Sequence, residues 1–269
     1  GWDGTIVSKP AQSEDGTYQI GTAAELAWFA ALVNGTLTDG TAQNLAANAV
    51  LTADIDLNNK NWMPIGNDEK DATTKVRNDY AGTFDGKGYS VSNLKISGEA
   101  RYVGLFGYAS EGFIKNLHIT NANIEGSSNC GILLGYNSKS RVLNCSVTKS
   151  TLDVEKNSGF ICGGGDSSGS SSLENCFAKD NILKTDYVTP DSKYNKPVSG
   201  NIGGLVGNSG KLVIENCYVS NNTITHTPSG SEKSWGIISG TNRATIKNCY
   251  YEKAADDTNA YDCILGEEK

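Results

Sequence analysis

The residues of this chain that could perform acid–base or metal chemistry are few and far apart in sequence. A polysaccharide lyase needs carboxylates that bind Ca²⁺ near a cationic side chain, and a glycoside hydrolase needs converging carboxylates. Asp54, Asp56 and Asp85 come closest to such a set, but their positions favour corners or outward strand sites. The doublet Asp256 and Asp257 follows the last repeat. We therefore predict no catalytic residue.

Histidine, arginine and cysteine spacings give no further support for catalysis. His118 is predicted at an outward strand position and His226 in a loop, so neither is expected to be a general base or a metal ligand. No CxxC pair and no cysteine–histidine spacing typical of zinc is present. None of the arginines is in register with an acidic pair: Arg77, Arg101, Arg141 and Arg243. We predict no metal and no cofactor, and we favour a non-enzymatic chain over an enzyme.

These residues lie on a repeat. A box of six residues recurs, in which an apolar residue, any residue, Asn, Leu or Cys, any residue and an apolar residue follow one another. The first copy runs from Val91 to Ile96, and the Asn residues of all copies are at positions 93, 116, 144, 175, 216 and 248. Their steps of roughly 23 to 41 residues equal one supersecondary unit plus variable loops, which is typical of a solenoid.

Each repeat carries further strand signals beside the Asn box. A glycine-bounded apolar box, such as the one from Val103 to Gly107, precedes all copies but the first, and another apolar position falls eight residues after most of the Asn residues. We expect three short strands per coil, and parallel strands that recur in this way pair with their own copies about 4.8 Å away. The predicted fold is all-β, a right-handed parallel β-helix.

Alternation along the Asn box predicts which side chains point into the coil. The residues two before the Asn, one after it and three after it are expected inside. The ladder one after the Asn reads Leu94, Leu117, Cys145, Cys176, Cys217 and Cys249. Stacked parallel strands hold cysteines in poor disulfide geometry, so we interpret them as buried thiols. The Asn is expected to close a corner in the left-handed conformation and to form a ladder inside the coil.

The residue two after the Asn is predicted to face solvent and gives the candidate binding surface. Along the coils this position reads Lys95, His118, Ser146, Phe177, Tyr218 and Tyr250. Its last three members form an aromatic row, and Tyr108 and Tyr136, which each follow a glycine, form a shorter second pair. Aromatic side chains on a rigid sheet suit sugar rings or a protein partner. Alternatively, the C-terminal tail or the loop 186–198 covers the row.

The N-terminal part differs from the repeat. Thr22 and Glu25 form a capping box that opens an amphipathic stretch, and Gly35 ends it, so we expect a helix over about 20–35 that plugs the end of the coils. The whole chain, 1–269, is predicted to be a single domain. After the helix come first coils over about 49–96, regular coils over about 102–251 and a tail over 252–269. Loops are expected where the period breaks, at 67–79, 166–172 and 186–198.

Composition restricts the partners of the chain. A net charge of −7 at pH 7, with no cluster of Lys or Arg, disfavours nucleic acid. No apolar run approaches the roughly 20 residues that span a bilayer. We therefore expect no nucleic-acid partner, no membrane span in this chain, and a monomer.

The combined motifs resemble the GLUG-motif β-helix proteins found on the surfaces of bacteria, especially gut anaerobes. The resemblance rests on GLFG at 104–107 and GLVG at 204–207, supported by 22–34 (TAAELAWFAALVN), 51–57 (LTADIDL), 62–66 (WMPIG) and 82–94 (GTFDGKGYSVSNL). It covers roughly residues 16–251. The resemblance implies a right-handed parallel β-helix in an exported or surface-attached, often adhesin-like protein. It implies no catalytic residues.

The sequence leaves three functions open. The first is a cell-surface or secreted binding or adhesion module, which contacts a glycan or a protein through its loops and outward aromatic residues. The alternative is a polysaccharide-active enzyme, either a pectate-lyase-like lyase or a glycoside hydrolase. Carboxylates of adjacent coils that converge in a groove with Arg, Lys or Ca²⁺ would favour the enzyme. A purely structural spacer, the third function, predicts no binding at all.

Overall fold

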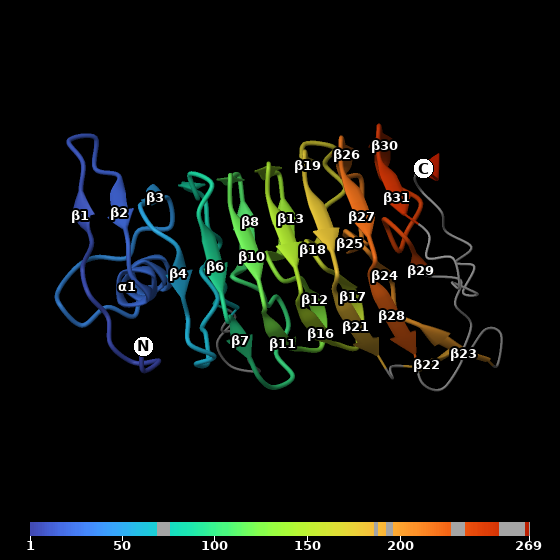
Figure 1. Cartoon of the computed structure of the whole chain (residues 1–269), viewed down its shortest axis with the longest axis horizontal. Helices are drawn as coiled ribbons and strands as arrows, with labels where there is room; N and C mark the ends of the chain where they lie inside the picture. The colour runs from blue at the N-terminus through green and yellow to red at the C-terminus, as the bar shows by residue number, and fades with distance from the viewer. Residues whose placement is uncertain (69–75, 186–187, 192–195, 227–234, 253–266, 269) are drawn as a thin grey trace.

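Stacked coils of short parallel strands make up most of the molecule. The structure, a computed structural model of the chain, describes residues 1–68, 76–185, 188–191, 196–226, 235–252 and 267–268. The stack runs from β1 (Ala11–Gln12) and α1 (Ala23–Asn34) at one end to β30 (Thr245–Lys247) and β31 (Tyr250–Glu252) at the other (Figure 1). This is the predicted parallel β-helix with a short helix near its N-terminus. Asp256 and Asp257 lie outside the described residues.

Equivalent strands of successive coils form long sheets, which we name A to E. Sheet A contains β1, β2 (Tyr18–Ile20), β3 (Ala49–Leu51), β5 (Thr83–Asp85), β9 (Phe113–Lys115), β14 (Arg141–Leu143), β19 (Ser172–Glu174), β26 (Val213–Glu215) and β30. Sheet B contains β4 (Ile55–Asp56), β6 (Ser90–Ser92), β10 (His118–Thr120), β15 (Ser146–Thr148), β20 (Phe177–Lys179), β27 (Tyr218–Ser220), β31 and β32 (Glu267–Glu268). Apart from the antiparallel pair β1 and β2, these strands are parallel.

The remaining sheets complete the coil. Sheet C contains β7 (Lys95–Ile96), β11 (Asn123–Glu125), β16 (Thr151–Asp153), β21 (Ile182–Thr185) and β28 (Thr223–His226). Sheet D contains β8 (Phe106–Ser110), β13 (Leu134–Ser138), β18 (Cys162–Gly165) and β25 (Val206–Asn208). Sheet E contains β12 (Ser128–Cys130), β17 (Lys156–Gly159), β24 (Ile202–Gly203) and β29 (Trp235–Gly236).

A regular coil has more strands than the three predicted. The coil from β9 to β13 contributes one strand to each of the sheets A to E. Asn116 and Asn121, with φ of 54° and 55°, bend the chain between β9, β10 and β11. Each left-handed bend ends one strand and begins the next. The prediction counted the two strands on either side of an Asn as one strand. The reason is that apolar, inward-facing residues occur both before and after the bend.

The register of the first Asn box also differs from the prediction. In sheet B, Ser90 and not Lys95 lies next to His118. Lys95 belongs to sheet C, so Asn93 closes the second corner of its coil and is equivalent to Asn121. The prediction was wrong because both corners of a coil follow the same pattern of an apolar residue, an Asn and another apolar residue.

The repeated Asn residues close corners as predicted, but their ladder is on the outside of the coil. Their φ values lie between 49° and 59°. Asn144 donates from Nδ2 to Oδ1 of Asn116 at 2.9 Å, and Asn116 donates to Oδ1 of Asp85 at 3.0 Å. Asn144 is exposed, whereas the following residue, Cys145, is buried. The inside ladder was a wrong prediction, because the bend that turns the following residue inward turns the Asn side chain outward.

The cysteines after the repeated Asn residues are buried thiols, as predicted. Cys176 donates from Sγ to the carbonyl oxygen of Glu174 at 3.2 Å. A hydrogen bond with Cys145 and burial hold the pKa of Cys176 well above its ordinary value, so this thiol stays protonated. The described cysteines are free and buried: Cys130, Cys145, Cys162, Cys176, Cys217 and Cys249.

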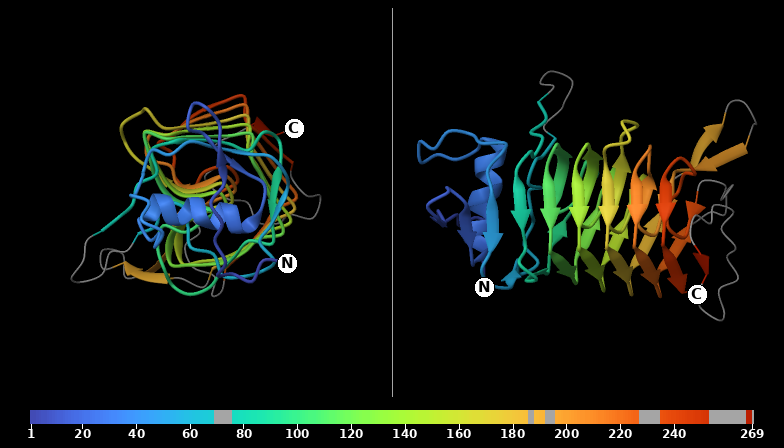
Figure 2. Two further views of the ribbon diagram at one scale, coloured as in Figure 1. Left: turned by 90° about the vertical axis from the view of Figure 1, so that its left-hand side faces the viewer. Right: turned by 90° about the horizontal axis from the view of Figure 1, so that it is seen from above.

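The helix α1 closes the N-terminal end of the coils, as predicted. Thr22 Oγ1 accepts a hydrogen bond from the Glu25 backbone N–H at 3.2 Å, and Gly35 follows the helix with φ of 72°. Phe29 packs edge-on against Phe84 of the first coils, with ring centroids 5.8 Å apart. In the end view, α1 lies across the mouth of the stack (Figure 2).

One insertion leaves the stack near its C-terminal end. β22 (Val188–Asp191) and β23 (Lys196–Ser199) form an antiparallel hairpin that projects from the coils (Figure 2). It occupies the described part of the predicted loop 186–198. Within the described residues, no helix is long and apolar enough to cross a membrane.

Candidate functional site

An aromatic row lies on the outer face of sheet B. Phe177, Tyr218 and Tyr250 begin β20, β27 and β31 and pair with one another in register. The rings of Phe177 and Tyr218 stack at a centroid distance of 4.8 Å and an interplanar angle of 5°. Parallel register holds equivalent side chains one strand spacing apart, and this brings the rings face to face.

The row is open to solvent at its middle residue. Tyr218 is 41% exposed. A pocket of about 220 Å³ adjoins it, lined by Tyr218, Val219, Tyr250, Tyr251 and Glu252. Glu252 Oε2 accepts a hydrogen bond from Ser220 Oγ at 2.7 Å. The tail strand β32 pairs with the edge of β31, so this described part of the tail lengthens sheet B beside the row.

The orientation of the stacked rings decides what a ligand can touch. Because Phe177 and Tyr218 face one another, a ligand that approaches sheet B from outside meets ring edges and the Tyr218 hydroxyl. A ring edge carries positive partial charge, and a phenol hydroxyl both donates and accepts hydrogen bonds. Both properties suit a partner rich in hydroxyl oxygens.

The row becomes polar toward the N-terminus. His118 and Ser146 occupy the two outward positions before Phe177. His118 Nδ1 lies 2.6 Å from Ser146 Oγ. Burial lowers the pKa of His118, so the imidazole is neutral at pH 7. The other histidine considered in the sequence, His226, is the last residue of β28 and so belongs to sheet C.

The second predicted pair, Tyr108 and Tyr136, is covered by other side chains. The two rings stack in sheet D at 4.9 Å and 18°. Tyr102 packs edge-on against both rings, at 5.3 and 5.8 Å. The guanidinium carbon of Arg77 lies 3.7 Å from the centroid of Tyr108. Since Tyr108 is 9% exposed, this pair belongs to a packed cluster and offers little surface to a ligand.

The charges around this cluster are already paired. Arg77 donates from Nη2 to Asp79 Oδ2 at 3.1 Å, and Arg101 Nε lies 2.6 Å from Asp68 Oδ2. Burial raises the pKa of Tyr136 to about 12, so this phenol is neutral at pH 7. The cluster therefore joins the segment around Arg77 to sheet D.

The three carboxylates that open the sequence analysis accept hydrogen bonds from neighbouring coils. Asp54 accepts a hydrogen bond from a backbone N–H of the next coil at 2.9 Å. Asp56 and Asp85 accept side-chain amide hydrogen bonds from Asn93 and Asn116, at 2.8 and 3.0 Å. The bond from Asn93 contributes most to the lowered pKa of Asp56. Asp56 and Asp85 are the last residues of β4 and β5, which agrees with the predicted placement at corners or on strands.

A row of carboxylates that sequence reasoning missed lies at the C-terminal ends of the sheet C strands. A groove of about 310 Å³ is lined by Glu99, Glu125, Asp153 and Glu155, among other residues. Glu125 and Asp153 pair in register, and Lys184 follows Asp153 in the next coil. The signal was an acidic residue directly after an inward apolar position in consecutive repeats. In the part of the chain that the structure describes, no group of three or more His, Cys, Asp or Glu is placed to hold a metal.

Comparisons with known proteins bear on the fold. The family model described as the GLUG motif matches residues 198–225, which run from the end of β23 into β28. The predicted GLUG-motif parallel β-helix is confirmed. Glycines of this motif allow close approach of coils, since a Cβ on Gly204 would lie 2.0 Å from the carbonyl oxygen of Ile237. Leu205 and Val206 of the motif are fully buried. The GLUG motif thus explains packing and names no ligand.

The GLUG-motif chain also resembles a solved structure. A crystal structure of a candidate immunoglobulin A1 protease from Bacteroides ovatus superposes with a TM-score of 0.60. The match covers 98% of this chain and 87% of the other, at 18% sequence identity. At that identity the likeness concerns the fold alone. No curated protein matches the sequence.

Proposed function

We propose that this GLUG-motif chain is a non-enzymatic extracellular binding module that holds a glycan on the outer face of sheet B. The observation that carries the proposal is the stack of Phe177 on Tyr218, continued in register by Tyr250 beside a pocket of about 220 Å³. Phenol hydroxyls and the Glu252 carboxylate can bond sugar hydroxyls, while the ring edges of Phe177 and Tyr218 contact sugar oxygens.

The solenoid suits glycan binding because its sheets keep the binding side chains in fixed positions. Residues fixed in a parallel sheet lose little further freedom on binding, and this reduces the entropic cost of association. Successive coils repeat at about 4.8 Å, so an extended chain lying along the stack would meet one aromatic residue per coil. An extended oligosaccharide is therefore the preferred ligand, and a protein partner is a second outcome of the test.

The proposal includes a location and a set of partners. We infer a secreted or cell-surface protein that acts as a monomer, in support of which stands the match to the GLUG motif. The net charge of −7 argues against nucleic acid as a partner.

The experiment is a glycan array probed with the whole chain, followed by titration of the best ligand against two variants. Phe177→Ala and Tyr218→Ala should each weaken binding by about tenfold or more, since each removes ring contact and one removes a hydroxyl. Tyr89→Ala is the matched control, because Tyr89 is a comparably exposed aromatic residue outside the row, at 37%. The affinity of the Tyr89→Ala variant for the same glycan should change by less than about twofold.

Two results would overturn this proposal. Glycan binding that both row variants retain would show that the ligand lies elsewhere. Absence of glycan binding, together with capture of a purified surface protein that Tyr218→Ala abolishes, would replace the glycan with a protein.

The alternative, a polysaccharide-active enzyme, would act at the carboxylate groove at the C-terminal ends of the sheet C strands. The in-register Glu125 and Asp153, with Lys184 in the next coil, are the observation in its favour. Reducing-end and unsaturated-product assays on pectin and other polysaccharides, with and without Ca²⁺, test it. Product formation that Glu125→Gln or Asp153→Asn abolishes would establish the enzyme, whereas no turnover leaves the groove as a solvated acidic surface.

A further inference from the structure

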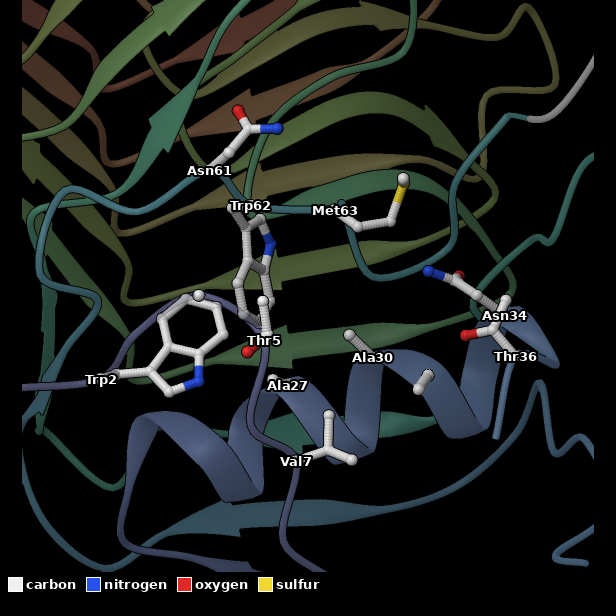
Figure 3. Close-up of a pocket in the computed structure, with 12 residues that line it drawn as sticks. Trp2, Thr5, Val7, Ala27, Ala30, Asn34, Thr36, Asn61, Trp62 and Met63 are labelled. Atoms are coloured by element: carbon white, nitrogen blue, oxygen red, sulfur yellow. The ribbon is translucent and has the colours of Figure 1, made fainter. Parts of the chain in front are cut away.

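A second pocket lies at the N-terminal cap, far along the stack from the aromatic row of sheet B (Figures 1 and 3). It has a volume of about 140 Å³, opens to solvent, and is bounded by the first residues of the chain, by α1 and by the segment 61–63. Figure 3 shows Trp2 and Trp62 side by side at one end and Asn34 and Thr36 at the other. Ala30 of the helix lies between these two ends.

Hydrogen bonds hold the N-terminal segment over the helix and so preform the pocket. The Trp2 indole N–H donates to the carbonyl oxygen of Ile6 at 2.8 Å. Asn58 Nδ2 donates to the carbonyl oxygen of Trp2, also at 2.8 Å. The backbone N–H of Ser8 donates to a carbonyl oxygen of α1 at 3.0 Å. Trp2 then packs edge-on against Trp62, with centroids 6.0 Å apart.

The size of the pocket fits one six-membered ring. Alanines of α1, at Ala27, Ala30 and Ala31, leave space that larger side chains would fill. A cavity of about 150 Å³ in another protein accommodates benzene. The present pocket is comparable in volume, and Met63, at its rim, is 59% exposed, so substituents of a bound ring can reach solvent.

The chemistry of the lining selects a neutral ring that carries hydroxyl groups. None of the residues that line the pocket is charged, although the chain has 30 acidic and 23 basic residues. Asn61 Oδ1 accepts a hydrogen bond from Ser97, at 3.3 Å, which leaves the amide N–H groups for a ligand. The Thr36 hydroxyl has no protein partner among the described residues. A purely apolar ligand would strip water from these groups without replacing it, which costs binding free energy.

We propose that this N-terminal pocket binds one neutral pyranose, with Trp2, itself held by Trp62, against its apolar face and Asn61 and Thr36 bonding its hydroxyls. The proposal does not rest on the aromatic row, because the two sites share no residue. A chain with both sites holds sugar at two separated places along the stack.

Tryptophan fluorescence and saturation-transfer NMR test the proposal on the whole chain. The probes are the methyl glycosides of glucose, galactose, mannose and N-acetylglucosamine, with phenol as an uncharged ring that lacks the sugar hydroxyls. At least one glycoside should saturate at millimolar concentration. Ala27→Leu, which fills the pocket with a good helix former, should abolish that signal. Thr36→Val, which keeps the shape but removes the hydroxyl, should weaken binding about tenfold.

Matched controls separate this site from the aromatic row and from misfolding. Ala46→Leu makes the same change at an exposed alanine outside the pocket and should leave the affinity unchanged within about twofold. Phe177→Ala should also leave it unchanged, so failure of the sheet B proposal would not affect this result. The proposal is overturned if no glycoside saturates, if phenol alone binds, or if Ala27→Leu, folded by circular dichroism, still binds the glycoside.

Discussion

Sheets B and D each carry a pair of aromatic rings stacked across neighbouring coils, at centroid distances of 4.8 and 4.9 Å. In sheet B, Tyr218 is 41% exposed. In sheet D, Arg77 and Tyr102 cover the stack, and Tyr108 is 9% exposed. Stacking therefore follows from parallel register alone. What lies over the rings decides whether a pair stabilises the fold or is left for a ligand.

The largest expected difference between the two pairs is in stability. Tyr108→Ala removes a nearly buried ring that contacts Arg77, Tyr102 and Tyr136, so we expect the free energy of unfolding to fall by about 3 kcal/mol. Tyr218→Ala removes an exposed ring and should cost less than about 1 kcal/mol. Urea denaturation followed by circular dichroism measures both. Equal losses would show that the cover over sheet D contributes nothing.

A second prediction concerns Arg77, one of the side chains that cover the stacked rings of sheet D. Arg77→Ala deletes the cation over Tyr108 and an ion pair whose side chains are 25% and 29% exposed, and should cost about 1–2 kcal/mol. Arg141→Ala is the matched control, since Arg141 lies 5.0 Å from the Phe113 ring and pairs with a carboxylate, but is 51% exposed. It should cost less than about 0.5 kcal/mol in the same denaturation assay. A loss as large as that of Arg77→Ala would contradict a special role for the cover.

The repeat in the sequence predicts the coil, the buried cysteine ladder and the aromatic row, because each depends on alternation within one box. Register is harder. Ile114 to Ile119 and Ile119 to Ile124 follow the same pattern, so the box at Val91 fits both corners, and only the pairing of Ser90 with His118 decides between them. Local pattern fixes which side chains point inward, whereas the neighbouring coil fixes which corner they belong to.

The parts of the candidate sites that sequence reasoning missed come from outside the repeat. Arg77 belongs to a segment between β4 and β5 that has no period, so nothing in the pattern places it over Tyr108. The N-terminal pocket joins Trp2, Ala27 and Trp62, which are distant in sequence and belong to no shared motif. Contacts between non-periodic segments and the stack depend on tertiary packing, and a single sequence does not show that packing.

The polar end of the sheet B row should respond to pH. Burial lowers the pKa of His118 relative to the unfolded chain, where it is about 6.5. The folded state therefore favours the neutral imidazole, and the stability that this gives is present above the unfolded pKa and is lost as the pH falls through the folded pKa. His118→Gln should flatten the loss of stability between about pH 7 and pH 5. Denaturation midpoints at both pH values measure the effect, and parallel curves for the two proteins would contradict it.

The smallest expected effect concerns the residue that covers sheet D from the side. Tyr102 has φ of 53°, in the left-handed region, at the position that Asn129 and Asn157 occupy in the next coils with φ of 53° and 49°. A left-handed bulky residue costs about 1–2 kcal/mol, which Asn largely avoids. Tyr102→Asn also loses two edge-on ring contacts, each contributing about 0.5–1.5 kcal/mol. The two effects should nearly cancel, leaving a change below about 1 kcal/mol.

A double-mutant cycle separates the two effects that cancel in Tyr102→Asn. In a chain that already carries Tyr136→Ala, one of the edge-on contacts is absent, whereas the backbone strain at Tyr102 is unchanged. Tyr102→Asn should then stabilise the chain by about 0.5–1 kcal/mol relative to its effect in the parent protein. If the substitution has the same effect in both backgrounds, the contact with Tyr136 does not offset the strain. The left-handed tyrosine would then have to be maintained by its contacts with Tyr108 and Arg101.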